Sequence, residues 1–217
     1  MKIDKLELYN FKQYYGSQVL QFAGYQVDDN QNVTVIYGSN GKGKTTIYRA
    51  LMLALFGASE LTKDKELGRK GDKFYICNLS ALQESQDGSA MATVKVHFSH
   101  QGELFEIERV IVSQLFDDGQ IQEDILSSKL LHTDIYGKTT PYDREDEIER
   151  LILRIFDKRM KDYFLFDGER IEQLMRDDKS QREEVAKGIK NVLKIDALED
   201  AVQALNSLYA NYHREVQ

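Results

Sequence analysis

The sequence predicts an α/β fold, and three observations carry that prediction. A short β-branched run at 33–37 ends in glycines, and a helical pattern follows directly. Two runs, 93–99 and 103–113, alternate apolar and polar residues around a glycine-containing turn, which is typical of a hairpin. The 217 residues include one proline, which favours long helices, and one cysteine, which excludes a disulfide framework. The chain therefore combines a strand, glycine loop and helix with an antiparallel β lobe.

Composition narrows the class of protein. A hydrophobic fraction of 41% and a charged fraction of 30% are those of a folded globular chain. The net charge of -7 argues against a uniformly basic nucleic-acid surface, although a local basic stripe could still meet phosphates. The basic residues between Lys63 and Lys73 are interleaved with acidic ones, so we interpret them as a solvated surface, with contact to nucleotide or DNA as the alternative. No apolar run reaches the roughly 18 residues of a membrane span, and the first residues lack the long apolar core of a signal peptide. These features predict a cytoplasmic protein without a membrane partner.

The N-terminal elements can be read in order. Alternation predicts a strand at 3–10, paired with a second at 19–22 across a polar turn at 12–17. The run at 33–37 is of the fully buried kind that parallel sheets use. Helical spacing continues over 45–56, where the next glycine ends the helix.

The C-terminal part becomes increasingly helical. An amphipathic helix is predicted at 143–156. Heptad spacing then joins six residues: Leu198, Val202, Leu205, Tyr209, Tyr212 and Val216. We expect residues 198–217 to begin a protruding coiled coil and residues 1–197 to form the globular part. An amphipathic helix packed on its own domain is the alternative.

The glycine loop carries the chemistry. Residues 38–45 have a glycine, four residues and then Gly-Lys-Thr, between a strand and a helix, which is the P-loop pattern. Backbone N–H groups and the helix N-terminus would face nucleotide phosphates. Lys44 would reach the β- and γ-phosphates, and the Thr45 hydroxyl would hold Mg²⁺. The expected ATP-binding residues of the loop are Asn40, Gly41, Lys42, Gly43, Lys44, Thr45 and Thr46.

A second Gly-Lys-Thr-Thr at 137–140 lacks this context. His132 stands where the leading glycine should be, and Pro141 follows directly. Because neither the loop nor the helix is present, we interpret it as a polar surface turn.

These motifs point to a family. The chain resembles the N-terminal half-head of SMC-type, ABC-like ATPases in three places: Leu8-Tyr9-Asn10-Phe11-Lys12, the loop at 38–46, and the helix ending Ala-Leu-Phe-Gly at 54–57. The segment 164–171 resembles their Q-loop, and 182–199 resembles the helix that enters the coiled coil. The wording Phe-Asp-Gly-Glu is most similar to the DndD-type ATPases of bacterial DNA phosphorothioation systems. The resemblance implies a P-loop NTPase with an antiparallel β lobe and a parallel-sheet segment.

The resemblance also suggests two further site residues. Asp167 stands where related ATPases have the Q-loop glutamine, so it is a candidate Mg²⁺ ligand and, with Lys44, a catalytic residue. An aspartate satisfying local N–H groups before Gly168 is the alternative. Lys12 follows Asn-Phe, at a position that is basic in the family and lies near the nucleotide; a solvated lysine in a turn is the alternative.

Three family motifs are not found in this sequence: the signature motif, the Walker B pair and the switch histidine. The resemblance therefore implies an N-terminal fragment that binds Mg-ATP without turning it over. Its implied partners are the C-terminal half-head of the same chain, a second head in an ATP-sandwich dimer, DNA, and other proteins of a DNA modification or defence system. Two other functions stay open, a nucleotide-dependent scaffold with little hydrolysis and a P-loop kinase or GTPase.

Overall fold

The computed structural model describes residues 1–23, 32–58, 75–156, 165, 201–207 and 209. The chain divides into two compact units, Met1–Phe156 and Asp157–Gln217. In the second unit, residues 201–207 and 209 are helical, inside the range where heptad spacing predicts a helix. The coiled-coil pairing of that helix stays a prediction.

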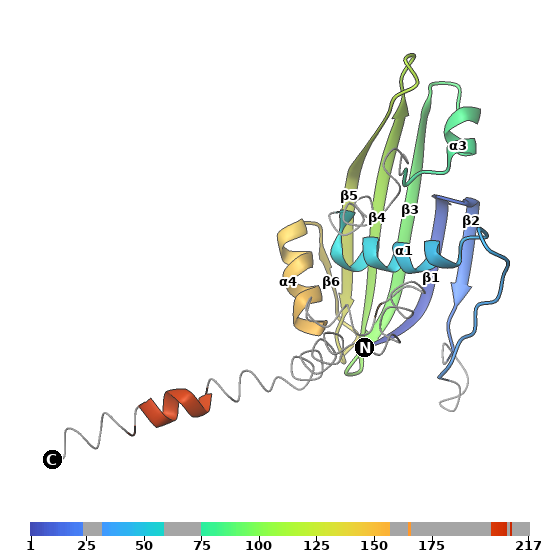
Figure 1. Cartoon of the computed structure of the whole chain (residues 1–217). Helices are drawn as coiled ribbons and strands as arrows, with labels where there is room; N and C mark the ends of the chain where they lie inside the picture. The colour runs from blue at the N-terminus through green and yellow to red at the C-terminus, as the bar shows by residue number, and fades with distance from the viewer. Residues whose placement is uncertain (24–31, 59–74, 157–164, 166–200, 208, 210–217) are drawn as a thin grey trace, which may run out of the picture. The chain divides into compact units, whose positions relative to one another are not determined.

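The first unit is built on a six-stranded sheet with the strand order β2-β1-β3-β4-β5-β6 (Figure 1). Every neighbouring pair is antiparallel, which confirms the predicted antiparallel lobe. The strands are β1 (Lys2–Phe11), β2 (Tyr14–Gln21), β3 (Ser89–His100), β4 (Glu103–Leu115), β5 (Ile121–Thr133) and β6 (Thr139–Tyr142). The helices with defined bounds are α1 (Lys44–Phe56), α3 (Leu79–Glu84) and α4 (Glu145–Ile155).

The β3–β4 hairpin is confirmed and is longer than predicted. Its turn is the pair Gln101-Gly102, whose φ angles of 52° and 84° are both positive. Two residues with positive φ form the turn type whose twist matches that of paired strands. The pairing runs without a register shift from Ser99↔Leu104 to Ser89↔Gln114. This hairpin is the centre of the sheet.

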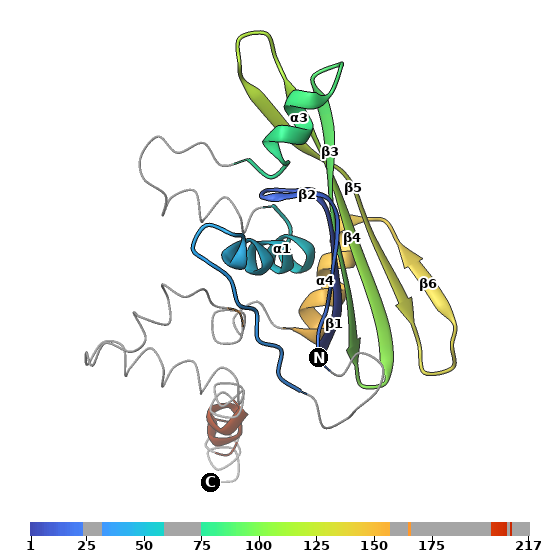
Figure 2. The same cartoon turned by 90° about the vertical axis from the view of Figure 1, so that its right-hand side faces the viewer.

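One face of the sheet forms the core. Buried side chains alternate along β3 and β4, as the period of two requires. Helix α1 crosses this face (Figures 1 and 2), and eight of its side chains are buried. The fully buried residues of the sheet face and of α1 include Leu6, Leu8, Leu53, Ala54, Val94, Val96, Ile107 and Ile111. Burial of this apolar surface, at about 25 cal/mol per Å², is the main term that holds α1 on the sheet.

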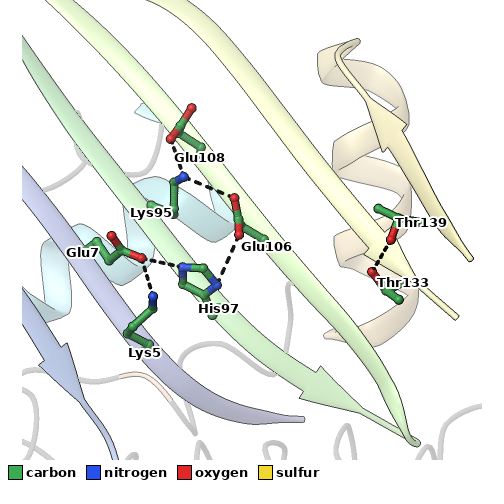
Figure 3. A network of polar contacts seen from close by, with 8 residues as sticks. All are labelled: Lys5, Glu7, Lys95, His97, Glu106, Glu108, Thr133 and Thr139. Atoms are coloured by element: carbon green, nitrogen blue, oxygen red, sulfur yellow. Dashed lines mark hydrogen bonds and ion pairs between the residues drawn. The ribbon is translucent and has the colours of Figure 1, made fainter. Parts of the chain in front are cut away.

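The opposite face carries charges. We call the following residues the charged ladder: Lys5, Glu7, Lys95, His97, Glu106 and Glu108 (Figure 3). Lys95 Nζ lies 3.2 Å from Glu106 and 2.9 Å from Glu108, and His97 Nε2 lies 2.7 Å from Glu7. The hydrogen bond from Lys5, together with that from His97, lowers the pKa of Glu7 although burial opposes the shift. Helix α1 lies behind the strands in this view. The charged side chains on this face pair with one another instead, Lys5 with Glu7 within β1 and the rest between neighbouring strands.

The predicted buried strand at 33–37 is wrong for the structure. These residues form no strand with any described part of the chain, and Val35 and Tyr37 are 84% and 99% exposed. A parallel strand buried on both faces needs a neighbour on each side. All six described strands belong to the one antiparallel sheet. The parallel-sheet segment of the predicted fold is therefore not found among them.

The turn predicted at 12–17 is also wrong. Strand β2 begins at Tyr14, so the connection is only Lys12-Gln13. Positive φ angles at Asn10 (44°), Lys12 (51°) and Gly16 (66°), with a register shift between Tyr9 and Phe11, let the chain reverse this tightly.

The remaining predictions agree better with the structure. Helix α1 begins at Lys44 and is followed by Gly57, as predicted, and α4 falls within the predicted 143–156. The second Gly-Lys-Thr-Thr is a surface turn that leads into β6. Among the described residues, no helix is long and apolar enough to cross a bilayer.

Candidate nucleotide-binding site

The loop before α1 exposes the amino end of a helix. Gly41 and Gly43 have φ angles of 79° and 94°, which only glycine adopts without strain. Gly43 is the N-cap of α1, no side chain caps the helix, and its first turn has no acidic residue. The first N–H groups of a helix lack intrahelical partners and carry partial positive charge. The loop therefore offers amide donors to an anion.

Lys44 adds a full positive charge at the same place. Its Nζ donates to the carbonyl oxygen of Gly38 at 2.6 Å and to that of Ser39 at 2.9 Å. The ammonium group thus lies over its own loop while the residue stays exposed. Both acceptors are neutral carbonyls, so these two contacts do not neutralise the positive charge of Lys44. A polyphosphate in the loop would therefore interact with that charge directly.

The two threonines after Lys44 differ in their surroundings. Thr45 is exposed, whereas Thr46 is 1% exposed and its hydroxyl donates to Gln13 Oε1 at 2.5 Å. Of the two residues, only Thr45 is open to solvent. Asn40, Gly41 and Lys42 form the exposed turn of the loop. The other four predicted loop residues, 43–46, are the N-cap and the first residues of α1, so all seven lie at the amino end of this helix. The predicted contacts of these residues with ATP stay predictions.

Lys12 is held in its turn by contacts with residues 75–78. Its Nζ donates to the Tyr75 carbonyl at 3.2 Å, its N–H donates to Ile76, and the Asn78 side chain donates to its carbonyl. The residue is half-buried, which disfavours the alternative of a simple solvated lysine. Its contact with phosphate stays a prediction. A pocket of about 270 Å³ is lined by Lys12, Gln13, Tyr75, Cys77, Asn78, Leu79 and Ser80.

A distant carboxylate fixes the segment that holds Lys12. Glu123 of β5 accepts the N–H groups of Ile76 and Cys77, each at 2.8 Å, and the Ser113 hydroxyl at 2.8 Å. Cys77 is buried, and burial raises the pKa of its thiol. A series of hydrogen bonds, and not apolar packing alone, therefore connects β5 through residues 76–77 to Lys12.

Sequence reasoning missed two residues that touch the loop, Gln13 and Tyr14. Tyr14 Oη donates to the Gly43 carbonyl at 3.1 Å, and burial raises the pKa of its phenol. The signal that could have found them is the pair of tyrosines, Tyr14 and Tyr15, within the segment 12–17 that we predicted to be a polar turn. Strand β2 begins at Tyr14, so a strand positions the Tyr14 side chain, whereas Gln13 lies in the turn directly before it.

The carboxyl end of α1 is clamped by a buried arginine. Arg109 of β4 is 1% exposed; its Nε donates to the Ala54 carbonyl at 2.9 Å, and its Nη1 donates to Ser128 at 2.8 Å and Glu145 at 2.7 Å. Burial opposes ionisation of Glu145, but the hydrogen bonds from Arg109 and Ser128 and the Arg109 charge prevail and lower its pKa. The cation also suits the partial negative charge of a helix C-terminus. This clamp fixes the helix that presents the loop.

Several predicted site residues lie outside the described residues. They are Asp167 with most of the Q-loop-like segment 164–171, and the basic residues between Lys63 and Lys73. The described part of the chain contains no group of three or more His, Cys, Asp or Glu residues placed to hold a metal ion. The predicted Mg²⁺ ligands, Thr45 and Asp167, are therefore untested.

Two curated proteins are similar to this chain in sequence. The DNA double-strand break repair Rad50 ATPase of Thermoplasma acidophilum is 25% identical, over 97% of this chain and 20% of the relative. The DNA replication and repair protein RecF of Carboxydothermus hydrogenoformans is 30% identical, over 48% of this chain and 26% of the relative. The chain thus spans about a fifth to a quarter of the length of these relatives.

A family model covers nearly the whole chain. The model described as an AAA domain matches residues 5–214, a range that includes the loop, α1 and the sheet. Together with the two similar proteins, this match shows that the chain belongs to the AAA domain family, among the ATPases of SMC and ABC type.

Proposed function

We propose that this chain is the N-terminal half of the head of an SMC-type ATPase and that it binds Mg-ATP at the loop before α1. The observation that carries the proposal is Lys44, whose ammonium lies against the Gly38 and Ser39 carbonyls at the uncapped amino end of a helix. A triphosphate would replace those neutral acceptors with charged ones, which bind an ammonium more strongly. The proposed ATP-binding residues are Lys12, Asn40, Gly41, Lys42, Gly43, Lys44, Thr45 and Thr46.

The loop has the chemistry that Mg-ATP needs. An added Cβ at Gly38 or Gly41 would meet nothing within 4 Å, so the backbone there is open to a ligand. Mg²⁺, when bound, would neutralise charge on the phosphate oxygens. The exposed Thr45 hydroxyl is an oxygen ligand of the kind Mg²⁺ prefers, and Asp167 is the proposed carboxylate.

The exposed run before the loop supports a second half-head. Val33, Val35 and Tyr37 are 74%, 84% and 99% exposed, although a β-branched run with these residues is suited to a pleated, half-buried surface. We propose that the C-terminal half-head of the same chain supplies neighbouring strands and that a second head closes over ATP. ATP binding and hydrolysis would couple this head closure to DNA repair, restriction or modification, with DNA and other proteins of that system as partners. The relatives named for DNA repair support this class, and the phosphorothioation branch rests on the Phe-Asp-Gly-Glu wording alone.

The binding proposal has a matched control within the chain. Lys44→Ala removes the loop cation, and we expect Mg-ATP affinity, measured by calorimetry, to fall at least about 100-fold. Lys138→Ala changes the lysine of the second Gly-Lys-Thr-Thr, which lies in a surface turn, and should bind like the wild type. Equal affinity for wild type and Lys44→Ala would contradict the proposal.

A second experiment separates a DNA-driven motor from a nucleotide-dependent scaffold. ATP turnover is measured for the parent protein containing both half-heads, with and without duplex DNA, beside its Lys44→Ala variant. DNA-stimulated turnover that the variant lacks supports the motor, and DNA binding should then weaken steeply with salt. ATP binding without turnover supports the scaffold.

A further inference from the structure

Tyr14 reaches the loop at the residue that caps α1. Three donors converge on the Gly43 carbonyl: Tyr14 Oη at 3.1 Å, the Thr46 N–H at 3.0 Å and the Ile47 N–H at 3.2 Å. The two amides belong to the first turn of the helix, whereas the phenol comes from β2. The Gly43 carbonyl is therefore held from two elements at once.

The orientation of that carbonyl decides where the next N–H points. In a trans peptide unit the C=O and the N–H point in opposite directions. With the Gly43 oxygen drawn toward the helix and Tyr14, the Lys44 N–H of the same peptide unit points away from the helix, toward the loop. This amide has no intrahelical acceptor, since it is among the first of the helix. It is one of the donors that a phosphate at a helix N-terminus uses.

The Tyr14 ring and Gly43 also fit each other sterically. A Cβ at position 43 would lie 3.0 Å from Tyr14 Oη and 3.1 Å from Tyr14 Cζ, and the φ of 94° excludes other residues without strain. The neighbouring Gln13 accepts the Thr46 hydroxyl at 2.5 Å, so the turn between β1 and β2 contacts the helix one turn further on. These contacts brace the loop against the edge of the sheet.

We propose that Tyr14 is a positioning residue of the phosphate loop, which holds the Gly43 carbonyl and so aims the Lys44 N–H at the bound phosphates. The inference rests on the proposed function, because it assigns a role in binding Mg-ATP. It adds a residue from outside the loop motif to the site. It also gives Tyr14 a task that differs from contact with the base or ribose.

The test compares Tyr14→Phe with Tyr15→Phe. Tyr15 Oη donates to Glu84 at 2.6 Å, so its variant loses the same hydroxyl group away from the loop. The affinities of the 217-residue chain for Mg-ATP and for Mg-tripolyphosphate, which has neither base nor ribose, are measured by calorimetry. We expect Tyr14→Phe to lose about 3- to 10-fold for both probes, the effect of one hydrogen bond. Tyr15→Phe should change neither affinity.

Other results overturn the proposal in distinguishable ways. A loss for Mg-ATP without a loss for tripolyphosphate would mean that Tyr14 acts on the nucleoside. Unchanged affinities, including the case in which only the thermal midpoint falls, would mean that Tyr14 has a structural role alone. If wild type and Lys44→Ala bind both probes equally poorly, the proposed function itself fails, and the inference fails with it.

Discussion

Two β-branched runs of this chain have similar composition and opposite surroundings. Residues 92–96, Ala-Thr-Val-Lys-Val, lie in β3 between β1 and β4, where Val94 is 0% exposed. Residues 33–37, Val-Thr-Val-Ile-Tyr, have no strand partner among the described residues, and Val35 is 84% exposed. β-Propensity measures how well a residue fits a pleated, half-buried surface, so neighbours decide whether it is realised. In the sheet, β1 and β4 supply the neighbouring strands for residues 92–96. Residues 33–37, before the loop that leads into α1, have no such neighbours among the described residues.

The largest effect is expected on the sheet side, at Arg109. Arg109→Ala removes three hydrogen bonds from the junction of β4, α1, β5 and α4 and leaves the Ala54 carbonyl without its donor. We expect a loss of about 3 kcal/mol in the free energy of unfolding, at the low end for a broken buried pair because Glu145 is 53% exposed. Urea unfolding measures it.

The control for Arg109 is an arginine at the surface. Arg150 pairs with Asp146, and the two side chains are 68% and 53% exposed. Arg150→Ala should cost less than about 0.5 kcal/mol. Equal losses for the two variants would mean that Arg109 does not clamp the end of α1.

A matched pair of valines tests the comparison directly. Val94→Ala removes two methyl groups from the core and should lower the free energy of unfolding by about 2 kcal/mol. Val35→Ala removes the same groups from an exposed site and should change it by less than about 0.5 kcal/mol. A large loss for Val35→Ala would show that the run before the loop is already packed. If the proposed C-terminal half-head supplies neighbouring strands, we expect the loss at Val35 to rise toward that at Val94 when both half-heads are present.

The smallest expected effect is a pH dependence of stability, which tests the pairing of Glu145 with Arg109 of the sheet. The folded-state pKa of Glu145 lies below its ordinary value of 4.5, so its pairing with Arg109 stabilises the fold above pH 4.5. This contribution is lost as the pH falls below 4.5 through the lowered pKa. Glu145→Gln should therefore be less stable than wild type by about 1 kcal/mol or less at pH 7. The difference should shrink toward zero in acid; a difference that grows in acid would contradict the assignment.

The sequence predicted elements whose pattern is local. The β3–β4 hairpin follows from alternation and from the glycine at its turn, and α4 follows from helical spacing. The P-loop was found because its glycines, lysine and threonine are contiguous. Each of these signals needs only neighbours within a few residues.

The misses depend on partners far along the chain. Burial at 33–37 requires neighbouring strands, which no pattern inside the run can supply. Tyr14 contacts Gly43 across 29 positions, and Arg109 contacts Ala54 across 55, so neither role is visible in local spacing. An arginine in an alternating strand is expected at the surface, because charged side chains are almost never fully buried unless they are paired.

The charged ladder of the open sheet face has a consequence for molecular encounters. Lys5 and Lys95 lie next to Glu7, Glu106 and Glu108, so opposite charges are separated by distances of only 2.6 to 3.2 Å. At physiological ionic strength the Debye length is about 8 Å. Beyond that distance the field of the close pairs largely cancels and leaves one carboxylate in excess, so a polyanion diffusing toward this face is not attracted to it. Electrostatic capture of a polyanion must therefore begin at another surface of the molecule.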